Sequence, residues 1–589
     1  MGLGALHLKP RAFGCHQQDL CSATKSGISD TKVLPASICH CSCSCVLVMP
    51  SALGAGGVNR ALLFTAAIGV KKPIQWQCSP VNKIGACSIK AQNRHEDKFR
   101  PLCRRSRTHV AHSFGDKTCK STRRRHIEIE DENNMPPPVR TRDTMAVTLP
   151  SGVDHALLPP PGRRVPLSPF DAYWAALPPI RRVFLFAPPS PPVPFADIAS
   201  ALRSSLAAVL PAFHPFAGEL VHDPTEPRAV AIACGDCAGV AFVEAETELD
   251  FARLVQEGAE HDVGALQQLV PDIRREELPA PVMAAQVTEF IGGCGGIAVG
   301  VTLHHAAADG RGLWRFLEMW AAAAASGAGS ATVPVAGEPA SPLHDRRLVS
   351  FEGDDGLARV FLRQVAPDLP RIVPKTKKDP SPPGQLSRRT FTLSSSLIQR
   401  LKRQLAAAAG TATAPSTFTT VAAHGWVSIA RASGFTDGAP VFATFLADIR
   451  AHMSPRVPDA YVGNCLALCA VAMAGAELTG PDGPSRACLA IGGAVAEVRR
   501  DPLAARARWL SMFANIPRGH AVIMAGSPWF PAYGVDFGFG RPVRVELASM
   551  NHDGEMVLVA GREAGSVQAS VAVAAHKMPA FRELFLADA

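Results

Sequence analysis

Residues 281–325, PVMAAQVTEFIGGCGGIAVGVTLHHAAADGRGLWRFLEMWAAAAA, show the clearest secondary-structure pattern in the chain. Residues 281–290 and 296–305 are two largely apolar runs joined by the glycine-rich turn IGGCGG, an arrangement that predicts a β-hairpin. A glycine-rich turn that cradles phosphate opens directly into a helix, whereas a strand follows here, so we interpret this turn as a hairpin loop. Residues 310–325 repeat apolar side chains three and four positions apart, which predicts an amphipathic helix that buries Leu313, Phe316, Leu317 and Trp320.

The same mixture of elements continues on both sides of this stretch. Before it, residues 195–213 carry an apolar stripe at helical spacing. After it, the pattern predicts helices over residues 394–409 and 419–432 and a strand over residues 441–450. The sequence therefore predicts a mixed α/β (α+β) protein, with no internal repeat at a short fixed period.

A region rich in Gly, Pro and Ser interrupts this pattern and suggests a division into domains. We expect a first α/β domain over residues 145–350, a crossover linker over residues 351–385 and a second domain over residues 386–589. Two halves of about 200 residues each are of ordinary domain size. A cleft between two such domains is a common place for a small-molecule site.

Charge and cysteine are distributed unevenly along the chain. Residues 1–134 carry 20 Lys and Arg against 9 Asp and Glu, while the rest of the chain carries 40 against 42. The expected globular part therefore lacks the basic surface of a nucleic-acid enzyme. Ten of the 16 cysteines also precede residue 135, and the sparse remainder favours a reduced, cytoplasmic protein over a disulfide scaffold. No uninterrupted apolar run reaches the roughly 18 residues of a membrane span.

Residues 1–144 form a basic, cysteine-rich extension with little hydrophobic periodicity. We expect it to be disordered and without function, and three origins stay open: a transit peptide, a solvated tail, or upstream sequence from a wrong start-site choice. The run CHCSCSC at residues 39–45 contains thiols that can chelate a soft metal, but its spacing is not that of ordinary zinc modules. No metal site is therefore expected.

The segment HHAAADG, residues 304–310, carries the expected chemistry. It lies where a strand ends and a helix begins, so a side chain there can face a cleft while the strand holds it in place. Histidine can take a proton near neutral pH, and strand alternation points His304 and His305 to opposite sides. Asp309 at the helix start can cap the helix or pair with an arginine. A structural histidine is the alternative, and we assign that role to His304.

Further recognisable segments stand in order on both sides of this motif. HAAADG at residues 305–310 and DFGFG at residues 536–540 stand 231 positions apart. The flanking segments are PLSPFDAYW (166–174), FHPFAGEL (213–220), TEF with the glycines and histidines after it (from Thr288), ADIRAHMSPRVPDAYVGNC (447–465) and SPWFPAYGVDFGFGRP (527–542). The chain thereby resembles the plant BAHD acyltransferases, whose hallmarks are HxxxDG and a distant DFGWG. The resemblance runs from about Met145 to the C-terminus.

The resemblance implies a fold, a reaction and a set of site residues. The fold is that of the coenzyme A-dependent, chloramphenicol acetyltransferase-like acyltransferases: two domains of similar size with a channel between them. His305 is then the general base that deprotonates an acceptor hydroxyl, and the oxygen attacks the thioester of an acyl-CoA cosubstrate, with no bound cofactor or metal. Asp309 supports the loop. The DFGFG residues are structural, and we expect Asp536 to pair with Arg450. Those residues are Asp536, Phe537, Gly538, Phe539 and Gly540.

The resemblance is less secure at two places in the chain. Phe539 replaces the Trp of the family motif, which keeps the aromatic bulk but loses an N–H donor. Arg388 and Arg389 match a family strand that borders the channel mouth near the 3′-phosphate of coenzyme A. They are candidate coenzyme A-binding residues, and an exposed pair at a strand end is the equally open alternative.

Among BAHD enzymes the motifs most resemble the branch that acylates sugar hydroxyls of anthocyanins and other flavonoid or phenolic glucosides. We therefore expect a monomeric enzyme that takes malonyl-CoA or hydroxycinnamoyl-CoA and a phenolic glycoside. An ester synthase acting on a shikimate-like acceptor stays open. So does a non-catalytic ligand-binding relative, although such a module has no need of a base. A serine hydrolase is disfavoured because no Gly-x-Ser-x-Gly elbow is present.

Overall fold

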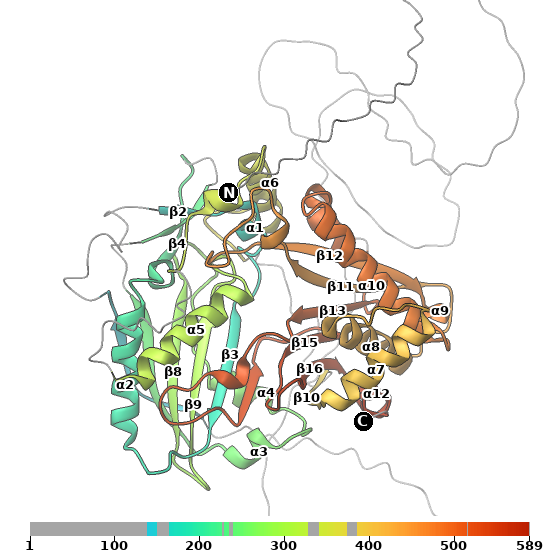
Figure 1. Cartoon of the computed structure of the whole chain (residues 1–589). Helices are drawn as coiled ribbons and strands as arrows, with labels where there is room; N and C mark the ends of the chain where they lie inside the picture. The colour runs from blue at the N-terminus through green and yellow to red at the C-terminus, as the bar shows by residue number, and fades with distance from the viewer. Residues whose placement is uncertain are drawn as a thin grey trace, which may run out of the picture. The chain divides into compact units, whose positions relative to one another are not determined.

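The computed structural model describes residues 138–149, 164–225, 229–234, 239–327, 341–373, 386–514 and 516–587. The expected extension, including the cysteine run at residues 39–45, lies outside the described residues except for its last positions. Figure 1 shows the described elements as two lobes, one around strands β8 and β9 and one around β11 and β16. A mixed α/β architecture is therefore confirmed.

The larger sheet of the first lobe has the strand order β1-β6-β8-β9-β3-β14. The predicted hairpin is at its centre, where β8 and β9 pair in antiparallel register from Met283 opposite Leu303 to Phe290 opposite Gly296. Strand β6 pairs with β8 in parallel, and the other pairs are antiparallel. The bounds are β1 Arg140–Val147, β6 Val240–Thr247, β8 Met283–Phe290, β9 Gly296–Leu303, β3 Ile180–Phe186 and β14 Arg544–Leu547.

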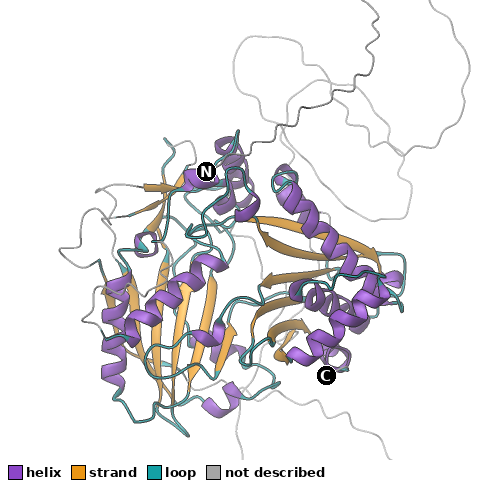
Figure 2. Ribbon diagram, viewed as in Figure 1, coloured by secondary structure: helices purple, strands orange, loops and turns teal. Residues whose placement is uncertain are grey.

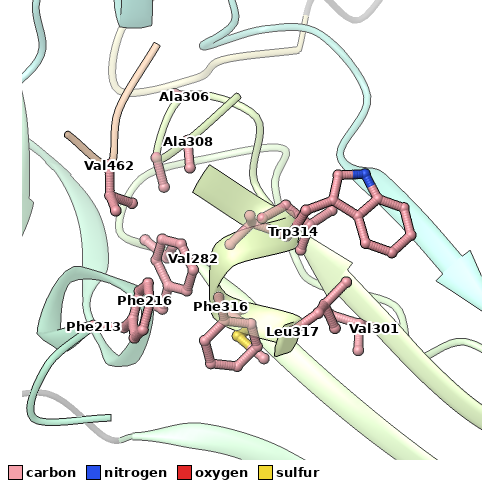
Figure 3. Packing of buried hydrophobic residues seen from close by; sticks show 14 of the residues in the cluster. Phe213, Phe216, Val282, Val301, Ala306, Ala308, Trp314, Phe316, Leu317 and Val462 are labelled. Carbon is pink, nitrogen blue, oxygen red and sulfur yellow. The ribbon is translucent and has the colours of Figure 1, made fainter. Parts of the chain in front are cut away.

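Helices α2 (Phe195–Val209) and α5 (Gly310–Ala325) lie side by side on this sheet (Figure 1). Helix α5 buries the apolar stripe that its sequence predicts. The ring of Phe213, beyond the end of α2, contacts those of Phe216 and Phe316 edge-on or tilted, and Figure 3 shows these rings gathered together. The indole of Trp320 donates a hydrogen bond to the Leu202 carbonyl, at 3.1 Å, and so ties the two helices together.

A smaller sheet and several short helices complete the first lobe. The sheet has the order β2-β5-β4-β7. Its strands are β2 Arg164–Pro166, β5 Val230–Ala233, β4 Glu219–His222 and β7 Ala280–Pro281. The other helices in this part of the chain are α1 Pro169–Ala172, α3 Phe251–Val255, α4 Val263–Gln268 and α6 Asp354–Val365. Short 3₁₀ turns occur at His214–Ala217 and Arg346–Val349.

The second lobe is built on the sheet β10-β16-β15-β13-β11-β12, with helices gathered on one side of it (Figure 2). On β13, Val522 packs beneath these helices, while Ile523 and Ala525 point the other way, because successive residues of a strand alternate faces. The strands are β10 Leu386–Leu393, β16 Val567–Ala574, β15 Glu555–Ala560, β13 Ala521–Gly526, β11 Pro440–Asp448 and β12 Leu466–Ala474. The helices are α7 Ser395–Ala408, α8 Thr417–Ala432, α9 Gly475–Thr479, α10 Gly483–Arg500 and α12 Met578–Leu586. The short helix α11 (Trp509–Ala514) instead packs Trp509 against Phe170 of the first lobe. Further 3₁₀ turns are Arg450–His452, Arg506–Arg508, Ala532–Gly534 and Ala575–Lys577.

The lobes do not follow the chain in two consecutive pieces. Strand β14, from the C-terminal half, pairs antiparallel with β3 and forms one edge of the first sheet. The DFGFG segment before it packs into the first lobe's core through Phe537. The proposed boundaries need a second correction at residues 351–385, because part of this expected linker is helix α6; residues 374–385 lie outside the described residues.

The N-terminal boundary at Met145 also needs correction. Strand β1 begins at Arg140 and pairs with β6 along its whole length. Arg142 forms ion pairs of 2.7 Å with both Glu246 and Glu289, and Arg140 forms another with Glu246. The last residues of the expected disordered extension are therefore part of the first sheet.

Candidate active site

Both lobes line a large cavity of about 2020 Å³. The first lobe contributes residues of β3, α5 and the loop before α5, and the second contributes residues of β11, β13 and the N-terminus of α8. His305 is in its wall, as is Trp174 from the segment that follows α1. The cleft expected between two α/β halves is thus present, and the expected base borders it.

The position of His305 follows from where β9 ends. The strand stops at Leu303, and the loop that begins at His304 leads into α5. The imidazole of His305 stacks on the indole of Trp174, with 3.7 Å between ring centroids and 8° between ring planes. Asn464 Nδ2 donates a 2.8 Å hydrogen bond to the His305 carbonyl. The stack on Trp174 therefore orients the ring of His305, and the hydrogen bond from Asn464 holds its backbone.

The surroundings of His305 favour an uncharged imidazole. Burial lowers the pKa of His305 below its ordinary value, and the smaller opposing effects include the carboxylate of Asp309. Nδ1 is buried without a hydrogen-bond partner among the described residues, so Nε2 is the nitrogen that a substrate in the cavity can reach. A neutral imidazole with an accessible nitrogen can accept a proton at neutral pH.

His304 has a different environment. Its side chain is 1% exposed and is absent from the cavity wall. Its Nδ1 accepts a 3.2 Å hydrogen bond from the backbone N–H of Ala306, and burial lowers its pKa to about 3. His304 is therefore a neutral core residue, as strand alternation predicts.

Asp309 both caps α5 and pairs with an arginine. Its Oδ1 accepts a hydrogen bond from Gly312 N at 3.1 Å, and its Oδ2 accepts from Arg450 Nη2 at 2.8 Å and from Cys465 N at 3.2 Å. Both side chains of the ion pair are 1% exposed. No hydrogen bond joins Asp309 to His305 in the described residues, so Asp309 positions the loop.

A second buried ion pair, which the sequence reasoning missed, supports the same loop. Arg346 Nε lies 3.1 Å from Asp171 Oδ2, and Arg346 Nη2 donates to the Ala307 carbonyl at 2.7 Å. The other oxygen of Asp171 accepts hydrogen bonds from the backbone and side-chain nitrogens of Asn464 at 3.0 and 2.9 Å. Asp171 and Asn464 belong to the quoted segments PLSPFDAYW and AYVGNC, which were the available signal, whereas Arg346 lies in none of the quoted segments.

Comparison with known proteins identifies this arrangement. A family model described as the Transferase family matches residues 155–587. The chain belongs to this family, the BAHD acyltransferases. It is accordingly an acyl-CoA-dependent acyltransferase, with the acyl-CoA as a cosubstrate.

Curated relatives of this BAHD chain include enzymes that modify glucosides. It is 27% identical over 443 residues to phenolic glucoside malonyltransferase 1 of Arabidopsis thaliana, covering 71% of this chain and 92% of the relative. It is also 27% identical to malonyl-coenzyme A:anthocyanin 3-O-glucoside-6''-O-malonyltransferase of Dahlia pinnata, covering 74% and 96%. A third relative is coumaroyl-CoA:anthocyanidin 3-O-glucoside-6''-O-coumaroyltransferase 1 of Arabidopsis thaliana, at 27% identity and 72% and 92% coverage.

Solved structures show the same fold. Vinorine synthase matches with a TM-score of 0.56 at 18% identity, covering 76% of this chain and 98% of the other. TRI101 of F. sporotrichioides, solved with coenzyme A and T-2, matches with a TM-score of 0.51 at 16% identity, covering 70% and 96%. The expected two-domain acyltransferase fold is therefore confirmed.

Asp536 of the DFGFG motif closes its own turn, and its predicted pairing with Arg450 is wrong. Asp536 Oδ1 accepts hydrogen bonds from the backbone N–H groups of Gly538 and Gly540, at 2.9 and 3.0 Å, and Arg450 pairs with Asp309 instead. Gly538 and Gly540 have φ angles of +97° and +107°, which glycine adopts without strain. The physical reason is local: Asp536 closes its own turn, whereas Arg450 is buried behind the His305 loop.

The two aromatic rings of the motif pack against the first lobe. Phe537 contacts Trp320 edge-on with 5.0 Å between centroids, and Phe539 contacts Phe186 edge-on at 4.9 Å. Phe539, in place of the usual BAHD tryptophan, thus has an apolar packing partner. No DFGFG residue is in the cavity wall.

Arg388 and Arg389 on β10 are both engaged with protein groups. Arg388 Nη2 donates to Asn551 Oδ1 at 3.1 Å. Arg389 donates to the Gly258 carbonyl at 2.9 Å and lies 3.3 Å from Glu260. Neither arginine is in the cavity wall, although Asn551 is. These contacts fit the structural alternative for the pair, and coenzyme A binding by them stays a prediction.

Two further features of the described ranges concern metals and membranes. None of these residues forms a group of three or more His, Cys, Asp or Glu that could hold a metal ion. No helix in the same ranges combines the length and the apolar character needed to cross a bilayer.

Proposed function

We propose that this chain transfers a malonyl or hydroxycinnamoyl group from its coenzyme A thioester to a hydroxyl of a phenolic or flavonoid glycoside, with His305 as the general base. The observation that carries this proposal is the position of the His305 imidazole in the wall of a cavity lined by both lobes, where burial lowers its pKa. The Trp174 stack holds the plane of that ring.

The reaction needs one proton acceptor and two aligned substrates. The acceptor hydroxyl donates a hydrogen bond to Nε2 of His305, and its proton moves to that nitrogen as the oxygen attacks the thioester carbonyl carbon. A C–O bond forms, and the tetrahedral intermediate then breaks its C–S bond. The departing sulfur takes the proton back from Nε2, which releases an ester and coenzyme A and restores the neutral imidazole. Alignment of the reactants supplies much of the remaining acceleration.

The size of the cavity supports two substrates bound together. Cavities for one small ligand usually measure about 300–1,000 Å³. The cavity here, at about 2020 Å³, has room for a coenzyme A thioester and a glycoside at the same time.

The choice of substrates rests on the relatives. Two of those described above are named as malonyltransferases acting on phenolic or anthocyanin glucosides, and one as a coumaroyltransferase acting on an anthocyanidin glucoside. We extend this chemistry to the present chain and further propose that it acts as a monomer in the cytoplasm. An ester synthase for shikimate-like acceptors and a non-catalytic ligand-binding protein are the alternatives to be tested.

A screen of donors against acceptors, read by mass spectrometry, tests the proposal. Malonyl-, acetyl- and coumaroyl-CoA are each combined with phenolic glucosides, anthocyanins and shikimate, and a thiol reagent measures free coenzyme A in parallel. We expect an acylated glycoside and acceptor-dependent coenzyme A release with the wild-type protein, and neither with His305→Gln. Release without an acceptor would indicate a hydrolase, acylated shikimate alone would indicate the ester synthase, and no turnover would favour the non-catalytic alternative.

A further inference from the structure

Arg182 on β3 is a buried cation without a counter-ion. Its side chain is 5% exposed, and its Nε is buried without a hydrogen-bond partner. No described carboxylate lies within 4.0 Å of its guanidinium. Its contact is with the ring of Trp314, whose centroid lies 5.5 Å from the guanidinium carbon. Both residues are in the cavity wall.

The other arginines that the described residues bury completely are all paired. Arg346 pairs with Asp171, Arg450 with Asp309 and Arg544 with Glu546. Burial alone would lower the pKa of each of these three arginines, but the neighbouring carboxylates raise it above its usual value.

For Arg182, in contrast, burial lowers the pKa to about 10, and the more distant carboxylate of Glu546 opposes this only in part. That carboxylate already accepts a hydrogen bond from Thr390 and lies 3.4 Å from His261. Arg182 is therefore still charged at neutral pH, and its charge is not balanced locally. A buried charge without a partner is costly, so a counter-ion that arrives with a ligand would stabilise this site.

The register of the sheet places Arg182 on the same face as the base. Arg182 pairs with Val301 of β9, and directly opposed residues of an antiparallel pair point to the same face. Val301 and Leu303 continue that face to the end of β9, and His305 follows in the loop that leaves the strand. Arg182 and His305 both line the cavity.

The sheet neighbours of Arg182 that line the cavity are apolar. Ile180 and Leu547 line the cavity beside it, and Leu547 is its direct partner on β14. The indole of Trp314 projects from α5 (Figure 3) and contacts the Arg182 guanidinium. One cation in such a setting suits a short acyl chain that ends in a charge, and it suits a hydrated phosphate poorly.

We propose that Arg182 forms an anion subsite that binds a carboxylate carried by the transferred acyl group, as in the half-thioester of a dicarboxylic acid. The planar guanidinium matches a carboxylate with two parallel N–H···O hydrogen bonds. This inference rests on the proposed acyl transfer from coenzyme A and narrows the donor to an anionic acyl group. Donors with neutral acyl groups leave Arg182 unpaired and are disfavoured.

Equilibrium binding tests the subsite without depending on turnover. Calorimetric titrations of wild-type protein with malonyl-CoA, acetyl-CoA and coenzyme A give three dissociation constants. We expect malonyl-CoA to bind about 10–100-fold more tightly than acetyl-CoA, the range of a hydrogen bond to a charged group. Equal affinities for the two thioesters would overturn the proposal on the wild-type protein alone.

Variants of adjacent arginines locate the effect. Arg182→Gln is expected to lose the preference for malonyl-CoA while binding acetyl-CoA as before, and Arg182→Lys is expected to retain part of it. Arg181→Gln is the matched control, because Arg181 is the preceding residue of β3, donates to the Gln267 and Val270 carbonyls and is absent from the cavity wall. Thermal melts verify that each variant is folded. If Arg182→Gln does not fold, the proposal is still tested by Arg182→Lys and by the preference of the wild-type protein for malonyl-CoA over acetyl-CoA.

The same measurements show whether the anion that Arg182 binds belongs to the acyl group, to a phosphate of coenzyme A or to the acceptor. An equal loss of affinity for malonyl-CoA, acetyl-CoA and coenzyme A in Arg182→Gln would mean that Arg182 contacts a phosphate, and would overturn the proposal. A rise in KM confined to acceptors that carry a carboxylate would assign the anion to the acceptor and would also overturn it. Absence of transfer with every donor, together with an intact malonyl-CoA preference, would reject the proposed function and leave the subsite standing.

Discussion

At the scale of single residues, two adjacent histidines have different roles because a strand alternates its faces. His305 borders the cavity against Trp174, whereas His304 is enclosed in the core. We expect His305→Ala to lower kcat about 10²–10⁴-fold with little change in melting temperature. His304→Ala should mainly lower the free energy of unfolding, by about 0.5–3 kcal/mol. Initial rates and denaturant titrations of both variants check this, and near-normal turnover by His305→Ala would reject the general-base role.

The burial of His305 also predicts a pH dependence. A general base works in its neutral form, so kcat/KM should rise with pH through the pKa of His305 in the free enzyme. Burial lowers that pKa below the ordinary histidine value of about 6.5. The midpoint of the acid limb is therefore expected below about pH 6.5, and the rate should be nearly constant from neutral pH upward. A profile of kcat/KM with buffer controls measures it, and a midpoint well above neutrality would contradict the assignment.

At the scale of elements, two buried ion pairs hold the loop between β9 and α5. Asp309 pairs with Arg450, and Asp171 with Arg346, which reaches the loop at the Ala307 carbonyl. Removing one member of a buried pair leaves the other charge unpaired and typically costs about 3–5 kcal/mol. We expect Asp309→Ala to lose that much stability, together with most of its activity. Urea unfolding of the variant and of the wild-type protein measures this change in the free energy of unfolding.

Asp536→Ala is the control for this prediction. Asp536 accepts two backbone hydrogen bonds in a partly exposed turn and has no ion pair among the described residues. Its loss should therefore cost only about 1–2 kcal/mol. A destabilisation by Asp536→Ala as large as that by Asp309→Ala would show that the DFGFG turn supports more of the fold than its contacts indicate.

At the scale of the whole molecule, the edge of the first sheet decides where the chain can be shortened. Strand β1 contributes the ion pairs of Arg140 and Arg142 to β6 and β8, and a chain that begins at Met145 lacks both arginines. We expect a chain beginning at residue 138 to match the full chain in melting temperature and initial rate. One that begins at Met145 should lose about 1–3 kcal/mol, from exposed ion pairs and strand hydrogen bonds. If the chain that begins at Met145 melts like the full chain, the residues of β1 before Met145 contribute little to stability.

Local patterns in the sequence predicted much of the secondary structure, and the ordered motifs predicted the family. The hairpin of β8 and β9 and the helices α5, α7 and α8 lie where periodicity predicts them, because the repeat of apolar residues is a local property of the chain. Placing a histidine at the end of a buried strand also needed only local information, and the ordered motifs indicated the family.

Contacts between residues far apart in the chain could be found only in the folded structure. Arg450 and Asp309 are 141 residues apart, and Asn464 and Asp171 are 293 apart, so spacing alone does not reveal which carboxylate a given arginine or amide reaches. The same holds for β14, which leaves the second half of the chain to complete the first sheet. It holds most clearly for Arg182, which has no carboxylate partner among the described residues of the folded protein. Whether a buried charge is paired depends on residues that folding brings near it, and these residues are not its neighbours in the sequence.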